Sequence, residues 1–247
     1  MRKIISIFTL LVTITVASYA QLQTDSIKVL FIGNSYTNYN RLPWLVQNIA
    51  HSDGIPLSVT MVEHGGWTLE KHASCEETLN AIKKGGWDFV VLQEQSQAPA
   101  REEEWVSKNV YPYAQKLDSL RKIYCPNGKT VFYMTWGHYN ESYPIMQQKL
   151  ANTYLGMAKR FRACCAPVGL AWRQYFCENH SGELHDSDKS HPNLRGSYLA
   201  ASVFYTTFFG KPFQSSYTAG LPANEAQYLQ KLAQKIVLEN PEEYIVE

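Results

Sequence analysis

The sequence lacks a long apolar segment beyond its N-terminus, an excess of charge of either sign, and any internal repeat or low-complexity segment. No stretch after residue 20 reaches the ~18 apolar residues that a membrane helix needs, so we expect no membrane insertion. The 23 basic residues nearly balance the 22 acidic residues. This balance indicates neither nucleic acid nor an anionic membrane as a partner.

Recognisable metal-binding spacing is also missing. The segment 180–191 contains side chains of the types that bind metals, but it matches no zinc motif such as H-E-x-x-H. These side chains are His180, His185, Asp186, Asp188 and His191. We therefore predict no metal site and no cofactor. A metal-dependent hydrolase that uses this segment remains an alternative.

Cysteine is scarce, with five residues at positions that suggest no particular pairing. In an exported protein, these five cysteines allow one or two disulfides, with one thiol left over. Buried free thiols are an equal alternative. The five are Cys75, Cys125, Cys164, Cys165 and Cys177.

The N-terminus has the layout of a cleaved secretory signal peptide. Arg2 and Lys3 precede the apolar run 4–16, and Ser18-Tyr19-Ala20 places small residues just before Gln21. The apolar run is too short for a transmembrane anchor. We expect a signal peptide over residues 1–20, export to the periplasm or the extracellular space, and a single domain over residues 21–247.

The remaining chain alternates short β-rich runs with helical patterns, which favours a parallel sheet with helices on both faces. We predict a three-layer α/β/α sandwich with a flavodoxin-like parallel sheet of about five strands. The expected strands are 28–32, 57–62, 89–92, 130–135 and 168–171. The expected helices are 42–50, 68–84, 102–123, 143–162, 193–209 and 224–239.

Polar and glycine-rich segments follow these strands, at the sheet edge where ligands bind in open α/β folds. Ser35 follows the first strand and the turn Gly33-Asn34. A serine on such a strand-to-helix loop exposes its hydroxyl beside backbone N–H groups that face a developing oxyanion. Alternatively, Ser35 serves only as a turn or cap residue.

Asp188 and His191 have the spacing D-x-x-H and are followed by Pro192. A neutral histidine accepts a hydroxyl proton when a carboxylate fixes its tautomer and stabilises the imidazolium. Three residues apart on a turn, both side chains reach one site. Taken with Ser35, the pair supplies the groups of a Ser-His-Asp triad.

Three segments together resemble the SGNH/GDSL hydrolase superfamily, in particular an exported branch with a G-N-S-Y-T motif. They are Phe31-Ile32-Gly33-Asn34-Ser35-Tyr36-Thr37, Gly65-Gly66-Trp67-Thr68, and Asp188 to Tyr198 with its D-x-x-H-P-x-x-x-G pattern. The resemblance implies that Ser35 is the nucleophile, with Asp188 and His191 completing the triad. It also implies an oxyanion hole formed by the backbone N–H groups of Ser35 and Gly66.

Two departures from that family pattern bear on the oxyanion hole. The residue before the nucleophile is the uncharged Asn34, and the family's G-x-N-D motif after the third strand is missing. That motif supplies an asparagine side-chain donor. Gln93 and Gln95 follow the third strand here and carry the same donor group on a longer stem. We expect one of them to complete the oxyanion hole; Gln97 is also admissible, and all three are otherwise solvated loop residues.

The expected activity is ester hydrolysis through an acyl-enzyme, without a cofactor. The sequence contains 16 Tyr and six Trp, many for this length, and such residues suit sugar-binding clefts as well as the core. The expected substrate is therefore a small-molecule or glycan ester, with an O-acetylated glycan as first choice. The alternatives are a lysophospholipase or thioesterase, and a non-catalytic glycan-binding protein on the same scaffold.

Overall fold

The computed structural model describes residues 26–178 and 184–246. The signal peptide expected over residues 1–20 lies outside these ranges, as does His180. Five parallel strands form one sheet in the order β2-β1-β3-β4-β5, which confirms the predicted sheet. The strands are β1 Ile27–Gly33, β2 Leu57–Glu63, β3 Phe89–Leu92, β4 Lys129–Tyr133 and β5 Cys164–Ala166.

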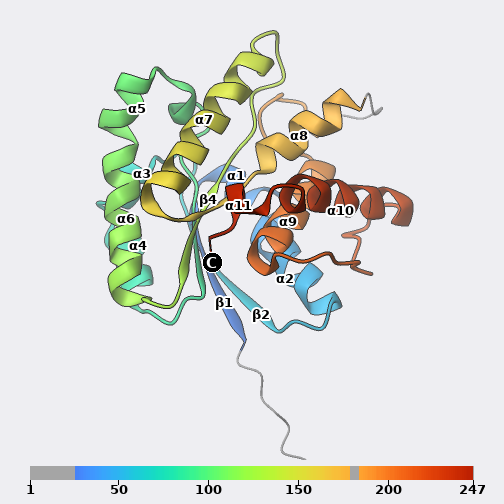
Figure 1. The fold of residues 1–247 in the computed structure, drawn as a ribbon, viewed down its shortest axis with the longest axis horizontal. Helices are drawn as coiled ribbons and strands as arrows, with labels where there is room; N and C mark the ends of the chain where they lie inside the picture. Colours follow the sequence, from blue (N-terminus) through green and yellow to red (C-terminus); the bar gives the residue numbers. More distant parts are fainter. Residues whose placement is uncertain (1–25, 179–183, 247) are drawn as a thin grey trace, which may run out of the picture.

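Helices cover both faces of the sheet, as predicted for a three-layer sandwich (Figure 1). One face carries α3 Leu69–His72, α4 Glu76–Lys83, α5 Glu103–Asn109, α6 Tyr111–Tyr124 and α7 Tyr143–Phe161. The other carries α2 Leu42–Ser52, α8 Val168–Cys177, α9 Leu194–Phe209 and α10 Ala223–Leu238. Four short elements are α1 Ser35–Asn38, η1 Tyr39–Arg41, η2 Ala98–Ala100 and α11 Pro241–Tyr244. In the described part of the chain, no helix is long and apolar enough to cross a bilayer.

Strand β1 lies between β2 and β3, and its side chains contribute to both apolar cores. Phe31 packs edge-on against Phe204 of α9, while Leu30 and Ile32 face the opposite core. Ile32 is paired in register with Val62 of β2 and with Leu92 of β3. The three strands therefore end at the same level, and the loops that follow them meet at one edge.

The fifth strand was predicted in the wrong place. Residues 168–171 begin helix α8, and the strand is the three-residue segment Cys164–Ala166 just before them. Pro167 separates the two, since it has no N–H to continue a ladder. Both segments are short, apolar and buried, so periodicity alone does not distinguish a strand from a helix here.

Two predicted long helices are each divided in the structure. Within 68–84, Cys75 adopts an extended backbone conformation and separates α3 from α4. Within 102–123, the break falls at Val110. Pro112, in the first turn of α6, has no N–H to bond to the preceding turn, which favours a new helix start at this point.

Helix α6 contains a buried ion pair that hydrogen-bonds to Thr130 of β4, and its loss should destabilise the fold. Asp118 and Arg121 pair at 3.1 Å, and Thr130 of β4 hydrogen-bonds to both side chains. Replacing Asp118 with Ala leaves the buried guanidinium without its anion, so we expect the free energy of unfolding to fall by about 3–5 kcal/mol. Urea denaturation measures this loss.

The matched control is Glu104→Ala, which removes the exposed Glu104–Lys108 pair of α5. An exposed pair of this kind contributes about 0.3–0.5 kcal/mol. If both variants lost the same free energy of unfolding, burial would not be what determines the contribution of the Asp118–Arg121 pair.

Candidate active site

Ser35 lies where β1 ends, as the first residue of α1. The preceding Asn34 has an extended backbone and caps this helix, with its side-chain oxygen accepting a hydrogen bond from the Tyr36 N–H at 3.2 Å. The strand and the cap therefore direct Ser35 to the carboxyl edge of the sheet. Its side chain is half-buried there.

The hydroxyl of Ser35 is connected to His191 and Asp188 by hydrogen bonds. Its Oγ lies 2.9 Å from Nε2 of His191, and Nδ1 of the same ring lies 2.5 Å from Oδ2 of Asp188. With Nδ1–H donating to the carboxylate, Nε2 accepts the proton of the Ser35 hydroxyl. The structure thus brings together, from segments more than 150 positions apart, the three residues that the sequence pattern singled out.

Asp188 is held in its charged form. Burial alone would raise the pKa of this carboxyl, but hydrogen bonds from the His191 side chain and from the N–H groups of Ser190 and His191 outweigh burial and lower the pKa to about 2. Both N–H groups donate to Oδ1 at 2.9 Å. A single carboxylate therefore shapes the turn and orients the imidazole.

Aromatic rings fix the position of the His191 ring. It stacks on Tyr39 at a centroid distance of 4.1 Å, and the ring of Tyr36 meets it edge-on at 5.4 Å. Tyr36 in turn stacks on Trp136, which stacks on Trp172. Both tryptophans are fully buried, so they pack the core and do not offer a face to a sugar.

The turn between Asp188 and His191 is attached to this aromatic column. The Ser190 hydroxyl hydrogen-bonds to the Tyr36 hydroxyl at 2.8 Å, and the Trp136 indole N–H donates to the Ser190 carbonyl at 3.0 Å. The Asn40 side chain donates to the Pro192 carbonyl at 2.9 Å. The sequence patterns did not indicate a positioning role for these residues, although Tyr36 lies within the G-N-S-Y-T motif.

The loop after β2 carries Gly66 and is connected to the loop that carries Ser35. The Asn34 side-chain N–H donates to the Trp67 carbonyl at 2.9 Å. An ionised aspartate has no proton to donate here, so asparagine at this position has a direct structural use. Gly66 has a positive φ of 70° in this turn. Within the described residues, no acceptor is paired with the N–H of Ser35 or of Gly66, as a donor to a substrate oxyanion requires.

The structure does not bring Gln93 or Gln95 into a hydrogen bond with Ser35. Gln93 is fully buried, and its Oε1 accepts from the Asn34 N–H at 2.8 Å and from the Thr37 hydroxyl at 2.9 Å. Gln95 accepts from the N–H groups of Gln97 and Ala98. Gln93 thus holds the loop that carries Ser35 through Asn34 and Thr37. A side-chain oxyanion donor after β3 stays a prediction.

The next residue, Glu94, is a buried carboxyl that sequence reasoning did not single out. Burial raises its pKa to about 7, although the N–H groups of Gln95 and Leu69 both donate to it. Through these bonds it joins the end of β3 to the start of α3. Among the described residues, Glu94 makes no hydrogen bond to the Ser35 hydroxyl, and we assign it a structural role.

The segment 185–191 does not form a metal site among the residues that the structure describes. His185 is buried, with Nε2 against the Gly137 carbonyl at 2.9 Å, and burial lowers its pKa to about 4. Asp188 is engaged by His191. All five cysteines are free thiols, and all five lie within the described ranges.

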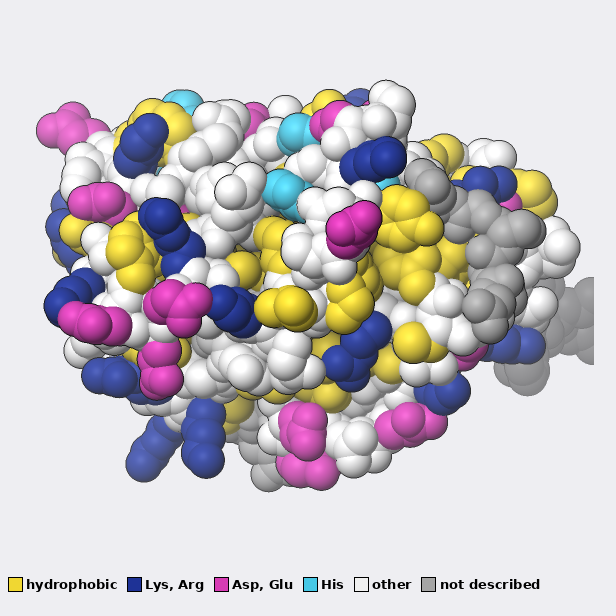
Figure 2. Space-filling view, turned by 90° about the horizontal axis from the view of Figure 1, so that it is seen from above, with side chains coloured by type: hydrophobic (Ala, Val, Ile, Leu, Met, Phe, Trp, Pro, Cys, Tyr) yellow, Lys and Arg dark blue, Asp and Glu magenta, His cyan; other side chains and the backbone are white. Residues whose placement is uncertain are grey.

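A cavity of about 720 Å³ opens beside the candidate site. Its lining includes Thr68, two positions after Gly66, and His138, whose Nε2 lies 3.3 Å from the Ser190 hydroxyl. Gln95, Arg101, Trp105 and Lys149 also line it. Figure 2 shows the molecule from above, with histidine side chains at the surface beside apolar and charged ones.

Solved structures of other proteins share this fold at low sequence identity. A DUF4886 family protein from Bacteroides uniformis is 16% identical with a TM-score of 0.69, over 90% of this chain and 98% of that one. An acetyl xylan esterase from Geobacillus stearothermophilus is 18% identical with a TM-score of 0.56, over 76% and 97%. A lipolytic G-D-S-L family protein from Veillonella parvula is 13% identical with a TM-score of 0.51, over 72% and 96%.

The chain therefore has the fold of SGNH/GDSL hydrolases, as its sequence motifs implied. No protein-family model and no curated protein sequence matches it. Catalytic mutants of the Geobacillus esterase replace an aspartate and a histidine that are three positions apart in that enzyme.

Gly33 is packed closely against the side chains of Thr37 and Gln93. A Cβ at Gly33 would lie 2.5 Å from Gln93 Oε1, the atom that accepts from the Asn34 N–H. Gly33→Ala should therefore displace this side chain and lower the free energy of unfolding by about 1–3 kcal/mol, measured by urea denaturation.

Gly65→Ala is the control, because a Cβ there meets nothing within 4 Å and the residue has no positive φ. It should stay within about 0.5 kcal/mol of the unmodified protein. Equal stability of the two variants would contradict the tight packing described for Gly33.

Proposed function

We propose that this protein is a serine ester hydrolase that works through an acyl-enzyme. The observation that carries the proposal is the unbroken hydrogen-bonded chain from Ser35 through His191 to Asp188. Each member has the neighbour that its role requires: a hydroxyl against an imidazole nitrogen, and a carboxylate against the other nitrogen. The catalytic aspartate and histidine of the acetyl xylan esterase, with the same spacing, support this assignment.

In the first half-reaction, Ser35 Oγ attacks the ester carbonyl while His191 Nε2 takes its proton. The N–H groups of Ser35 and Gly66 bind the oxyanion that forms. His191 then protonates the departing alcohol, and an acyl-Ser35 ester remains. In the second half-reaction His191 activates water, which releases the acid and restores the Ser35 hydroxyl. Asp188 stabilises the imidazolium in both halves.

For the substrate, we favour an O-acetyl ester of a carbohydrate. The acetyl xylan esterase with the same fold supports this class. So does the cavity beside the site, whose wall combines the indole of Trp105 with the polar Gln95, Arg101 and Lys149. A sugar presents apolar faces and hydroxyl groups that suit such a mixture. Because we expect a signal peptide over residues 1–20, we propose that the enzyme is exported.

The nucleophile is tested by replacing Ser35 with Ala. Loss of a triad member typically lowers kcat by ~10⁴ to 10⁶, so hydrolysis of short-chain and sugar acetates should fall to near background. The thermal unfolding midpoint should change little, because Ser35 is half-buried and the Asn34 cap remains. Initial rates with acetylated xylooligosaccharides and an aryl acetate measure the effect.

The control is Ser107→Ala on α5, which should keep full activity. If Ser35→Ala also keeps it, the triad assignment is wrong. If the unmodified protein binds acetylated glycans but hydrolyses no ester, the non-catalytic glycan-binding alternative replaces the proposed function.

The rate should depend on pH through the histidine and not through the aspartate. Because the pKa of Asp188 is lowered to about 2, its carboxylate stays charged throughout the range from about pH 4 to 8. Protonation of His191 removes the base, so kcat/KM should fall on the acid side with a slope of one. Asp188→Asn no longer fixes the tautomer of His191, so it should lower kcat by ~10⁴. A flat profile down to about pH 4 in the unmodified protein would contradict a histidine base.

A further inference from the structure

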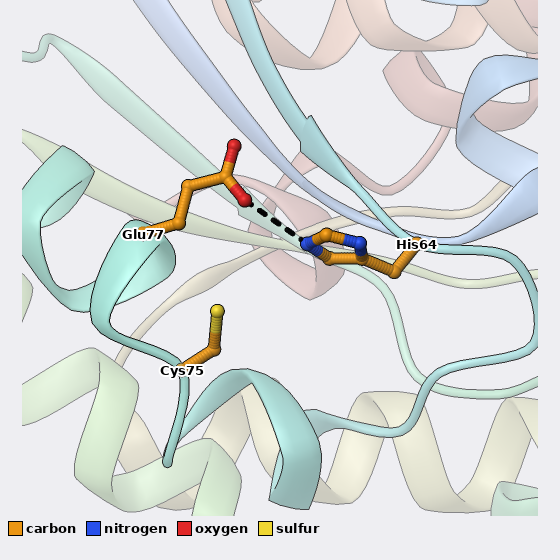
Figure 3. Close-up of side chains that lie close together, drawn as sticks. All are labelled: His64, Cys75 and Glu77. Carbon is orange, nitrogen blue, oxygen red and sulfur yellow. Dashed lines mark hydrogen bonds and ion pairs between the residues drawn. The ribbon is translucent and has the colours of Figure 1, made fainter.

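Three side chains of metal-binding types converge next to the Gly66 loop. They are His64, Cys75 and Glu77, and Figure 3 shows all three directed toward one another. His64 follows strand β2, while Cys75 and Glu77 lie at the start of α4. The sequence spacing matches no metal motif, since the residues come from two separate elements that only the fold brings together.

The distances suit a single small cation. The possible ligand atoms all lie within 4.8 Å of one another, and His64 Nε2 lies 3.1 Å from Glu77 Oε2. In a tetrahedral zinc site with metal–ligand bonds of about 2.0–2.3 Å, neighbouring ligand atoms are about 3.3–3.8 Å apart. The 3.1 Å separation and the 4.8 Å upper limit lie on either side of this range.

Neighbouring contacts leave the three side chains available, while the nearby His72 is engaged elsewhere. The Cys75 side chain does not cap α4 and is a free thiol. His72 is close to His64, but its two nitrogens are engaged by Thr78 and by the Gly33 carbonyl at 2.9 Å. The side chains of His64 and Glu77 are 34% and 61% exposed, which leaves one side of the site open to solvent.

We infer that His64, Cys75 and Glu77 bind one zinc ion, with water in the fourth position. A thiolate, an imidazole and a carboxylate form a donor set that zinc accepts readily and that magnesium and calcium do not favour. The thiolate and the carboxylate together balance the charge of Zn²⁺. Trp67 stacks on the His64 ring at 3.9 Å and restricts its orientation.

A bound ion would join the end of β2 to α4. The backbone N–H of His64 also donates to the Gly33 carbonyl at 3.3 Å, so this residue links the end of β2 to strand β1. Because the ion binds the folded chain and not the separated elements, it should raise the unfolding temperature. This effect does not depend on ester hydrolysis.

The experiment is metal titration of the purified, reduced and chelator-treated protein. Calorimetry with Zn²⁺ should give one equivalent per chain, with a higher thermal midpoint, whereas Mg²⁺ should give neither. Co²⁺ should produce a thiolate-to-cobalt charge-transfer band in the near-ultraviolet. Cys75→Ser should abolish that band and weaken Zn²⁺ binding at least about 100-fold, because even loss of an outer partner typically costs 10–100-fold.

His64→Gln should weaken Zn²⁺ binding similarly while retaining an uncharged side chain. Cys177→Ser, which removes an exposed free thiol elsewhere, should leave the band and the affinity unchanged. Asp188→Asn should also bind Zn²⁺ normally. The inference is overturned if the unmodified protein takes up no zinc, or if binding survives in Cys75→Ser. It is equally overturned if binding is lost in Asp188→Asn or Cys177→Ser.

Discussion

The hydrogen bond from the Asn34 backbone N–H to the side-chain oxygen of Gln93 holds the loop that carries Ser35 in place. It connects the residue after β1 with the residue after β3, at the level where the two strands end together. Thr37 donates to the same oxygen, so one buried carboxamide fixes both sides of Ser35. Asn34 then uses its own side chain to hold the Trp67 carbonyl. The expected oxyanion donors, Ser35 and Gly66, are therefore positioned by a single connected network.

A second constraint acts on the opposite side of the site. His191 comes from a turn before α9, and that turn is attached to the sheet by stacked aromatic rings and not by a regular element. Tyr36 links the two parts, since it follows Ser35 directly and also holds the Ser190 hydroxyl. The high aromatic content of the chain is partly explained here. Trp136 and Trp172 support Tyr36, which contacts His191, from within the core, and Trp105 lines the cavity beside the site.

The sequence predicted the sheet and the three groups that meet at its edge because these features are local. A buried strand, a glycine turn and a D-x-x-H spacing are each readable within a few residues. The fifth strand was misplaced because a three-residue strand before Pro167 has no pattern of its own. The use of Gln93 was missed because its hydrogen-bond partners are 56 and 59 positions away. The His64–Cys75–Glu77 cluster was missed for the same reason: it depends on tertiary packing.

We propose that Ser35 is a nucleophile whose oxyanion is bound by the backbone N–H groups of Ser35 and Gly66. The most direct measurement is a crystal structure of the protein after reaction with an organophosphonate ester. We expect a covalent bond from phosphorus to Ser35 Oγ, and a phosphonyl oxygen within hydrogen-bond distance of both N–H groups. We also expect Gln93 still to accept from the Asn34 N–H. An unmodified Ser35, or an adduct whose oxygen points away from Gly66, would contradict this proposal.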